Sequence, residues 1–297
     1  MLGKVELFFL LFLAGLVVKI ASGDRLIWLP KGIKIFLVYI GIPSVLISTL
    51  LSSQSITAEF SSAAAVTVLS IFSILGISIL YHKWKGQSDA DVLMLVNTFP
   101  NAGFLGLPVC YILFSDAGMY YASIYVLFGT LIHYSIGVFV AVYIKEGNIK
   151  KGLDGIKRFP GFYTMMLVFL IALFDPSLPQ GLISTLNILG ITTIILAIFF
   201  IGFSINFESR IKDFMIDFVH VTTFRFLLSP LSVLLLCLYF KIEPDVLLVQ
   251  SMMPPAIGST IIAAHYGMNY GASANVTSAI TILFMAGFFV AIYVFGF

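Results

Sequence analysis

Charged residues are scarce in this chain. The 297 residues include 16 Lys and Arg and 14 Asp and Glu, so that 10% of the chain is charged while 60% is hydrophobic. Soluble globular domains carry roughly 25% charged residues. The shortage excludes a water-soluble globule of this size, and the mean hydropathy of +1.08 indicates an integral membrane protein.

Cysteines and catalytic motifs are also rare. The two cysteines, Cys110 and Cys237, lie inside apolar runs, so no disulfide framework is expected. The sequence has no glycine-rich nucleotide loop, no His-Glu-x-x-His metal motif and no pair of aspartates inside an apolar run. These absences argue against ATP-driven transport and against an intramembrane enzyme. We expect no cofactor, no metal and no nucleic acid partner.

Apolar runs, in contrast, are abundant. A helix needs about 17 to 25 apolar residues to cross a hydrocarbon layer of about 30 Å. Because unpaired backbone groups cannot face lipid, and no alternating strand pattern occurs, the sequence predicts an all-α membrane protein of ten transmembrane helices. The expected spans are residues 5–20, 33–51, 63–81, 92–114, 120–144, 160–174, 182–205, 214–240, 246–264 and 272–297.

The positive charges lie mostly on one side of these spans. Cytoplasmic loops retain Lys and Arg, and thirteen of the sixteen fall on one side when alternate loops are counted. We therefore predict a multi-pass protein of the cell (inner) membrane with both termini outside the cytoplasm. A cleaved secretory signal at the N-terminus would reverse every later loop, so the first run is interpreted as a span. The thirteen are Lys19, Arg25, Lys31, Lys34, Lys83, Lys85, Lys145, Lys150, Lys151, Lys157, Arg158, Arg210 and Lys212.

The spans divide into two sets of five, in residues 1–159 and 160–297. Corresponding spans begin 149 to 155 residues apart. Because each half has an odd number of spans, the second half enters the membrane upside down, which is the inverted repeat of many secondary transporters. Three pairs of identical residues share a single offset of 155: Pro100 with Pro255, Gly103 with Gly258, and Tyr111 with Tyr266.

Helix-breaking residues occupy the middle of the fourth and ninth expected spans. The fourth contains NTFPNAGFLGLPV at residues 97–109, and the ninth contains SMMPPAIGST at residues 251–260. Asn101 and Pro255 each lie nine residues into their span, about 13 Å at 1.5 Å per residue. Proline removes a backbone hydrogen bond, so we expect both helices to unwind near the bilayer centre.

Unwound backbone at that depth must line a cavity. The N-terminal end of each following helix segment then favours an anionic group, and the C-terminal end of each preceding segment favours a cation. The alternative is that the prolines only kink packed helices. The candidate substrate-binding residues are Asn97, Thr98, Pro100, Asn101, Gly103, Arg225, Gln250, Pro254, Pro255, Gly258 and Ser259.

Two of the polar residues inside the spans are ionisable near their centre. Arg225 lies eleven residues into the eighth span, and no acidic residue lies at the centre of any span. Its expected partners are therefore helix carbonyls or an anionic substrate. His133 is a candidate for proton coupling, the alternative being a neutral buried histidine bonded to a backbone carbonyl.

The two broken spans resemble a known family. NTFPNAGFLGLPV and MMPPAIGSTIIAAHYGMN are similar to the fourth and ninth spans of the auxin efflux carrier (PIN-like) family. The resemblance implies the ten-helix fold of the bile-acid sodium symporters, with two broken helices crossing at the substrate site and Asn101 contributing to binding. Further segments that resemble the family are YIGIPSVLISTL, ILGITTIILAIFFIGFSI and RFLLSPL.

The same resemblance implies a division of labour among the helices. Spans 1, 2, 6 and 7 are expected to form a scaffold that dimerises, and spans 3–5 and 8–10 a moving transport core. The chain lacks the long cytoplasmic loop of the plant members and is similar to compact prokaryotic members, whose substrates are often carboxylates such as malonate. Auxin itself is therefore not implied.

The leading functional hypothesis is a secondary transporter that moves a small organic anion by elevator-like alternating access. Its coupling ion is H⁺, Na⁺ or none, and its expected partners are the anion, membrane lipid and a second copy of the chain. The alternative is a channel or a substrate-sensing receptor built on a transporter fold.

Overall fold

The described part of the chain is built from helices alone. The computed structural model describes residues 2–23, 25–26, 28–52, 58–85, 91–205, 211–268 and 271–295, and these contain α-helices, four π-helical segments and no strand. The all-α class expected from the sequence is confirmed. The elements are α1 (Leu2–Ser22), α2 (Trp28–Phe36), η1 (Leu37–Gly41), α3 (Ile42–Ser52), α4 (Ala58–Lys85), α5 (Asp91–Thr98), η2 (Ala102–Gly106), α6 (Leu107–Ile132), η3 (His133–Gly137), α7 (Val138–Glu146), α8 (Ile149–Arg158), α9 (Pro160–Phe174), α10 (Gln180–Phe203), α11 (Ile211–Thr223), η4 (Phe224–Leu228), α12 (Ser229–Phe240), α13 (Asp245–Ser251), α14 (Ile257–His265) and α15 (Gly271–Phe295).

Seven of the described helices are long and apolar enough to cross a membrane, and the number is eight if the bent pair α8 and α9 counts as one. Ten spans are not reached by this measure because some expected spans are broken or short. One of the seven, residues 102–146, is 45 residues long, about twice the length that one crossing needs. Inside it, α6 turns sharply at Ser115, where φ is 54°.

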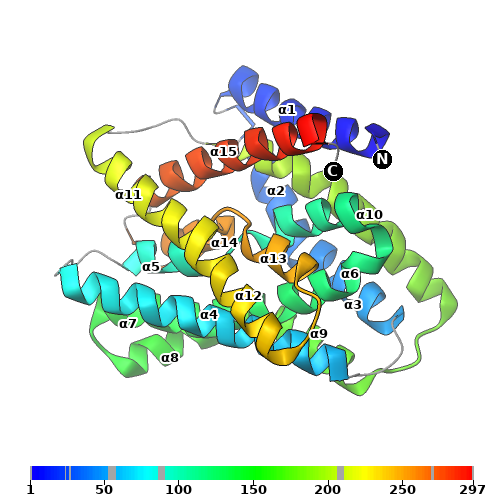
Figure 1. Ribbon diagram of the computed structural model, residues 1–297, viewed down its shortest axis with the longest axis horizontal. Helices are drawn as coiled ribbons and strands as arrows, with labels where there is room; N and C mark the ends of the chain where they lie inside the picture. Colours follow the sequence, from blue (N-terminus) through cyan, green and yellow to red (C-terminus); the bar gives the residue numbers. More distant parts are fainter. Residues whose placement is uncertain are drawn as a thin grey trace.

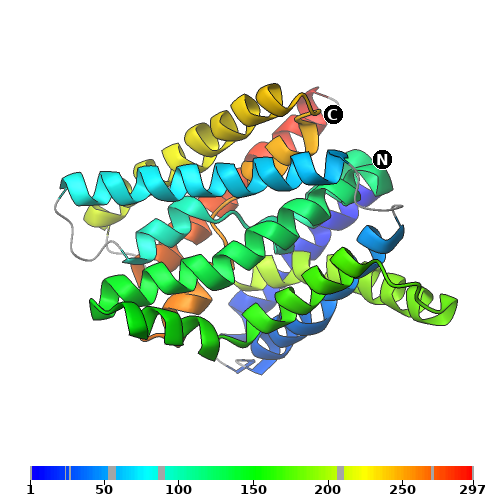
Figure 2. The same ribbon diagram turned by 90° about the horizontal axis from the view of Figure 1, so that it is seen from below.

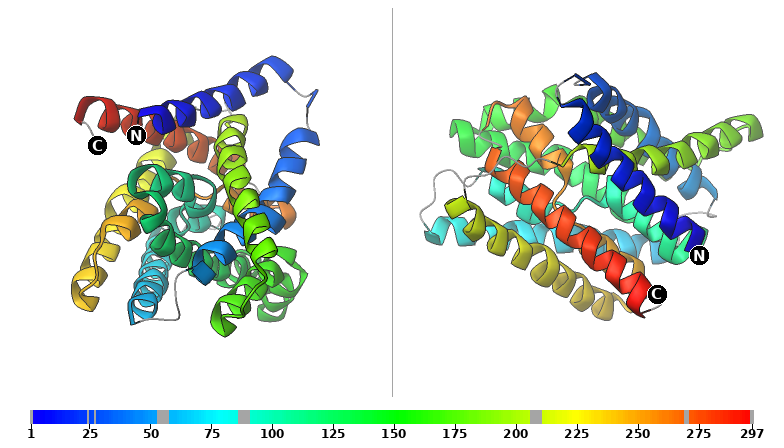
Figure 3. Two further views of the ribbon diagram at one scale, coloured as in Figure 1. Left: turned by 90° about the vertical axis from the view of Figure 1, so that its right-hand side faces the viewer. Right: turned by 90° about the horizontal axis from the view of Figure 1, so that it is seen from above.

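Close backbone contact joins α1 to α10. Glycines make this contact possible, since a Cβ added at Gly15 would lie 2.1 Å from the carbonyl oxygen of Phe199. A Cβ added at Gly202 would lie 2.0 Å from the carbonyl oxygen of Phe12. Small residues at such crossings let membrane helices pack through their backbones. The pair also packs against its neighbours, with α10 on α3 and α1 beside α15 (Figures 1 and 3).

A second group of helices packs around α4. It contacts α5, α6 and α12, while α11 packs on α15 and α12 on α13. Both chain termini lie at one end of the molecule, and the end of α4, the turn between α7 and α8 and the start of α11 lie at the other (Figure 2). The short helices α13 and α14 lie in the middle of the molecule (Figure 1).

Candidate substrate site at the helix crossing

Two helices are interrupted in the middle of the molecule. One break lies between the end of α5 at Thr98 and the start of η2 at Ala102. The other lies between the end of α13 at Ser251 and the start of α14 at Ile257. Both breaks coincide with the proline clusters, as the loss of helical hydrogen bonds at proline predicts.

The two breaks lie directly against each other. Pro100 and Pro255 form an isolated antiparallel bridge. The Asn101 N–H donates to the Pro254 carbonyl at 2.7 Å, and the Ala256 N–H donates to the Phe99 carbonyl at 2.8 Å. The bridge places each proline, which has no N–H, where no donor is needed.

The C-terminal ends of α5 and α13 meet the guanidinium of Arg225. Its Nε donates to the Met253 carbonyl at 3.1 Å, and its Nη1 donates to the carbonyls of Asn97 and Thr98, each at 3.2 Å. Its Nη2 donates to the Ser251 carbonyl. The Arg225 side chain is 0% exposed, so one buried cation balances the partial negative charge of both helix ends.

The N-terminal ends on the other face of the crossing have unpaired donors. Among the described residues, the amides of Gly103 and Phe104 in η2 and of Ile257 and Gly258 in α14 have no hydrogen-bond acceptor. The Asn101 side chain is 3% exposed, and its Nδ2 has no partner either. Unpaired amides at two helix N-termini form a site that favours an anion.

A cavity of about 40 Å³ lies beside these donors. That volume holds a few water molecules but lies far below the roughly 300 Å³ at which ligand pockets begin. The crossing therefore has little free space in this conformation. Its walls come from both breaks and from helices that pack around them: Val38, Ile42, Pro100, Asn101, Gly103, Phe104, Thr130, His133, Tyr134, Met165, Ala256 and Gly258.

His133 forms one wall of this cavity. Its ring stacks on Phe99 with centroids 4.1 Å apart, and its Nε2 lies 3.1 Å from the Ser259 hydroxyl. The partner is thus a side-chain hydroxyl rather than the backbone carbonyl expected for a neutral buried histidine. His133, in η3, therefore contacts both broken segments, through Phe99 in one and Ser259 in the other.

Several predicted binding residues lie near the breaks but outside the cavity lining. Asn97 donates from Nδ2 to the Ser78 hydroxyl at 2.9 Å, and the same nitrogen lies 2.9 Å from Nε2 of His220. The Thr98 hydroxyl donates to the Met94 carbonyl of its own helix. Pro254 contributes its carbonyl to the bridge.

Arg225 and Gln250 also stand apart from the cavity lining. Arg225 is turned to the carbonyls described above, and Gln250 is fully buried against Gly106. The cavity therefore gathers Pro100, Asn101, Gly103, His133 and Gly258, with Pro255 and Ser259 directly behind them.

The sequence did not single out the remaining wall residues. Val38, Ile42 and Met165 are apolar residues within apolar runs, and nothing in their local pattern marks them. Tyr134 carries a hydroxyl inside an apolar run and directly follows His133. This position next to a predicted site residue could have marked it as a candidate.

Comparison with known proteins places these features among transporters. The sequence matches the family described as "Membrane transport protein" over residues 29–152 and 149–294. It is also 26% identical over 263 residues to "Uncharacterized transporter MJ1031" of Methanocaldococcus jannaschii, an alignment that covers 84% of this chain and 85% of that protein.

Proposed function

Because this chain belongs to the membrane transport protein family, whose members are transporters and not enzymes, we propose that it is a secondary transporter of a small organic anion. Alternating access would expose the crossing first to one side of the membrane and then to the other. The observation that carries the proposal is the face of the crossing where helix amides and the buried Asn101 Nδ2 are left without acceptors. A carboxylate supplies the acceptors that these donors lack.

Unpaired donors in the protein interior are costly. A buried donor without a partner destabilises the protein by about 1–3 kcal/mol. A ligand carboxylate would recover that free energy, and charge-assisted hydrogen bonds are roughly twice as strong as neutral ones. The same donors would repel a cation, so the face selects for negative charge.

The bridge at the crossing supports an inverted repeat. The offset of 155 that pairs Pro100 with Pro255 also relates Asn101 to Ala256 and Phe99 to Pro254. The two hydrogen bonds of the bridge are therefore equivalents of each other under this offset. Residues on a two-fold axis meet their own equivalents, so we infer a pseudo-two-fold axis through the bridge, relating residues 1–159 to residues 160–297.

We also infer ten membrane crossings, from the lengths and breaks of the helices. Seven long helices and the bent pair make eight. Residues 102–146 make two crossings rather than one because α6 turns at Ser115, and α13 with α14 make the tenth. With ten crossings, both termini lie on the same side, and the distribution of Lys and Arg places that side outside the cytoplasm.

The cavity walls come from two groups of helices. Val38, Ile42 and Met165 lie on η1, α3 and α9, whereas Asn101, His133 and Gly258 lie on the group that contains both breaks. This division supports a scaffold of α1–α3, α9 and α10 and a transport core of the other membrane helices. We propose that the core slides against the scaffold, which also forms the homodimer contact.

The hydrogen bonds of Arg225 bear on which coupling ion the protein could use. In transporters with broken helices, helix C-termini and unwound carbonyls coordinate the coupling cation. Here the guanidinium already bonds those carbonyls. We propose that no Na⁺ binds at the crossing, which leaves H⁺, with His133 as its carrier, or no coupling ion.

A thermal-shift screen of the purified protein tests the proposal. The ligands are malonate, succinate, benzoate, indole-3-acetate and neutral amino acids. We expect at least one carboxylate to raise the melting temperature of the wild type, and Asn101→Ala to abolish that shift. Asn187→Ala is the matched control, because Asn187 is exposed and lies outside the central cavity. A wild type that no anion stabilises, or an Asn101→Ala variant that responds as the wild type does, contradicts the proposal.

A further inference from the structure

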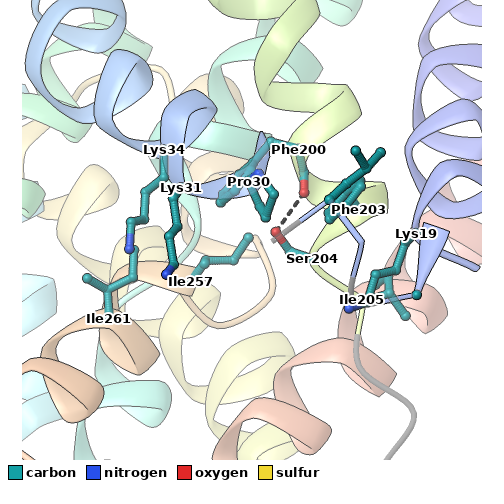
Figure 4. Close-up of a pocket in the computed structure, with 12 residues that line it drawn as sticks. Lys19, Pro30, Lys31, Lys34, Phe200, Phe203, Ser204, Ile205, Ile257 and Ile261 are labelled. Atoms are coloured by element: carbon teal, nitrogen blue, oxygen red, sulfur yellow. Dashed lines mark hydrogen bonds between the residues drawn. The ribbon is translucent and has the colours of Figure 1, made fainter. Parts of the chain in front are cut away.

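A second, larger cavity lies beside the crossing. It has a volume of about 370 Å³, within the range of small-molecule pockets. It lies between the start of α2, the end of α10 and the first turns of α14, and its walls include Lys19, Lys31, Lys34, Ser204 and Ile261 (Figure 4).

The charge of this basic pocket is one-sided. In the described part of the chain its walls include three lysines and no carboxylate, and none of the three lysines forms an ion pair. The Lys19 Nζ lies 5.9 Å from the centre of the Phe203 ring. Asp24 lies outside the described residues.

The rule that cytoplasmic segments are rich in Lys and Arg accounts for the presence of these lysines, but not for their direction. Lys31 and Lys34 extend from α2 over the pocket, with their amino groups beside Ile257 and Ile261 of α14 (Figure 4). Like charges one helical turn apart destabilise a helix. An anion held between them would reverse that effect.

Shared walls connect the basic pocket to the crossing. An adjoining cavity of about 350 Å³ also contacts Lys31, Lys34 and Ile261. The same cavity reaches Tyr134 and Gly258, which line the central cavity. The basic pocket, the adjoining cavity and the central cavity are therefore neighbours with common walls, and the lysines lie at one end of this series and the unpaired amides at the other.

The other side of the scaffold–core boundary differs in charge. A cavity of about 470 Å³ there is lined by Tyr111, Asp116 and Asn187, among others, and no Lys or Arg of the described residues contributes to its walls. Lys4 lies near it, over the Tyr111 ring, but is not part of its lining. This outer cavity shares no residue with the walls of the central cavity.

We propose that the basic pocket is an anion-collecting vestibule, and that substrate carboxylates reach the crossing through it from the lysine-rich side of the membrane. The identity of the anion rests on the proposed function, whereas the preference of the pocket for negative charge does not. With the lysine-rich side in the cytoplasm, the pocket would collect anions from the cytoplasm. A concave site lined by one sign of charge raises the local concentration of the opposite sign 10- to 1,000-fold.

A cysteine reporter tests the charge of the pocket without any substrate. Ser204→Cys is nearly isosteric and lies in the wall of the pocket (Figure 4). It is introduced after replacing Cys110 and Cys237, which are both buried, with alanine. In nanodiscs of phosphatidylcholine, one measures the rates of modification by an anionic sulfonatoethyl and a cationic trimethylammonium-ethyl methanethiosulfonate. Ile149→Cys, on the exposed surface of α8, is the reference position.

We expect the anion-to-cation rate ratio at Ser204→Cys to exceed that at Ile149→Cys about tenfold. Lys31→Gln with Lys34→Gln should remove this excess. Lys83→Gln with Lys241→Gln, which deletes two exposed charges outside the pocket and away from both cysteine positions, should leave it within twofold. An equal ratio at both positions, or no effect of Lys31 and Lys34, overturns the proposal.

Two further arms keep the result decisive. Ile261→Cys serves as a second reporter, and failure of both reporters to react would mean that the pocket does not open to water, which also overturns the proposal. Adding phosphatidylglycerol separates a lipid headgroup from a soluble anion. We expect the ratio to stay within twofold, and its collapse would assign the pocket to lipid. A lysine-dependent ratio in a protein that no carboxylate stabilises would instead refute only the proposed function.

Discussion

The two faces of the helix crossing differ in how their backbone groups without intrahelical hydrogen bonds are satisfied. On one face, four carbonyls at the ends of α5 and α13 accept hydrogen bonds from the buried guanidinium of Arg225. On the other face, the amides of Gly103 and Gly258 and the Asn101 Nδ2 have no acceptor among the described residues. The chain supplies its own cation but not its own anion.

This difference separates structure from function at the crossing. A group that is always satisfied by the protein is part of the fold, and its removal should affect stability. A group that is satisfied only by a ligand is available for binding, and its removal should affect affinity. Substitutions on the two faces therefore test the comparison directly.

Removing Arg225 should have the largest effect, and it should be an effect on folding. Arg225→Met leaves four carbonyls without their donor, at about 1 kcal/mol or more each, so we expect a loss of several kcal/mol and a strong drop in melting temperature or yield. Arg225→Lys should recover only part of the lost stability, because one ammonium group cannot reach all the carbonyls that the forked guanidinium contacts. The measurement is thermal unfolding in detergent, with the exposed Arg158→Met as control. A melting temperature unchanged by Arg225→Met would mean that the carbonyls do not depend on the guanidinium.

Changing Asn101 to aspartate should instead act on binding. The new carboxylate would face the ligand's carboxylate across a cavity of only about 40 Å³, and like charges at close range repel strongly. We expect at least a 100-fold loss of affinity for the stabilising anion, measured by titration of the thermal shift. Asn187→Asp, in the outer cavity, should bind within twofold of the wild type. Normal affinity in Asn101→Asp would place the anion elsewhere.

The broken helices were predictable from the sequence because proline acts locally. The clusters around Pro100 and Pro255 lie within long apolar runs, and the loss of helical hydrogen bonds at proline depends only on the residue itself. The role of Arg225 was narrowed to carbonyls or substrate by the lack of a carboxylate at the centre of any span. Only the tertiary structure shows that Arg225 bonds to four carbonyls and does not point into the cavity.

The scaffold side of the cavity was not predictable, for a physical reason. Ile42 and Met165 are apolar residues that contact the site only because α3 and α9 pack against the core. Asn97 shows the converse, a predicted residue that lies outside the cavity lining. It stands next to the break in sequence, but its amide turns to Ser78 and His220, because successive residues of a helix point in different directions.

A methyl group at Gly258, on the face with unpaired amides, should have a moderate effect on anion affinity. A Cβ there would lie 3.0 Å from Cε1 of His133, in the wall of a cavity of only about 40 Å³. Overpacking costs roughly 1–3 kcal/mol, and we expect most of this cost to arise when the anion also occupies the cavity. Gly258→Ala should therefore weaken anion binding about tenfold, with a smaller loss of stability in the ligand-free protein. Gly287→Ala, where a Cβ meets nothing within 4 Å, is the control. Unchanged affinity in Gly258→Ala would show that the ligand does not approach this helix end.

The smallest expected effect is that of sodium. If Arg225 holds the place of the cation at the C-terminal ends of α5 and α13, then replacing Na⁺ by choline at constant ionic strength should change anion affinity less than twofold. The measurement is the same titration of the thermal shift in the two salts. A wild type whose affinity depends strongly on Na⁺ would mean that a cation binds beside the guanidinium or elsewhere, and the contrast between the two faces would then fail.

In Arg225→Lys, whose ammonium reaches fewer of the carbonyls, the remaining ones become available to a metal ion. A Na⁺ dependence that arises in this variant but not in the wild type would therefore show that the guanidinium performs the task of the missing ion.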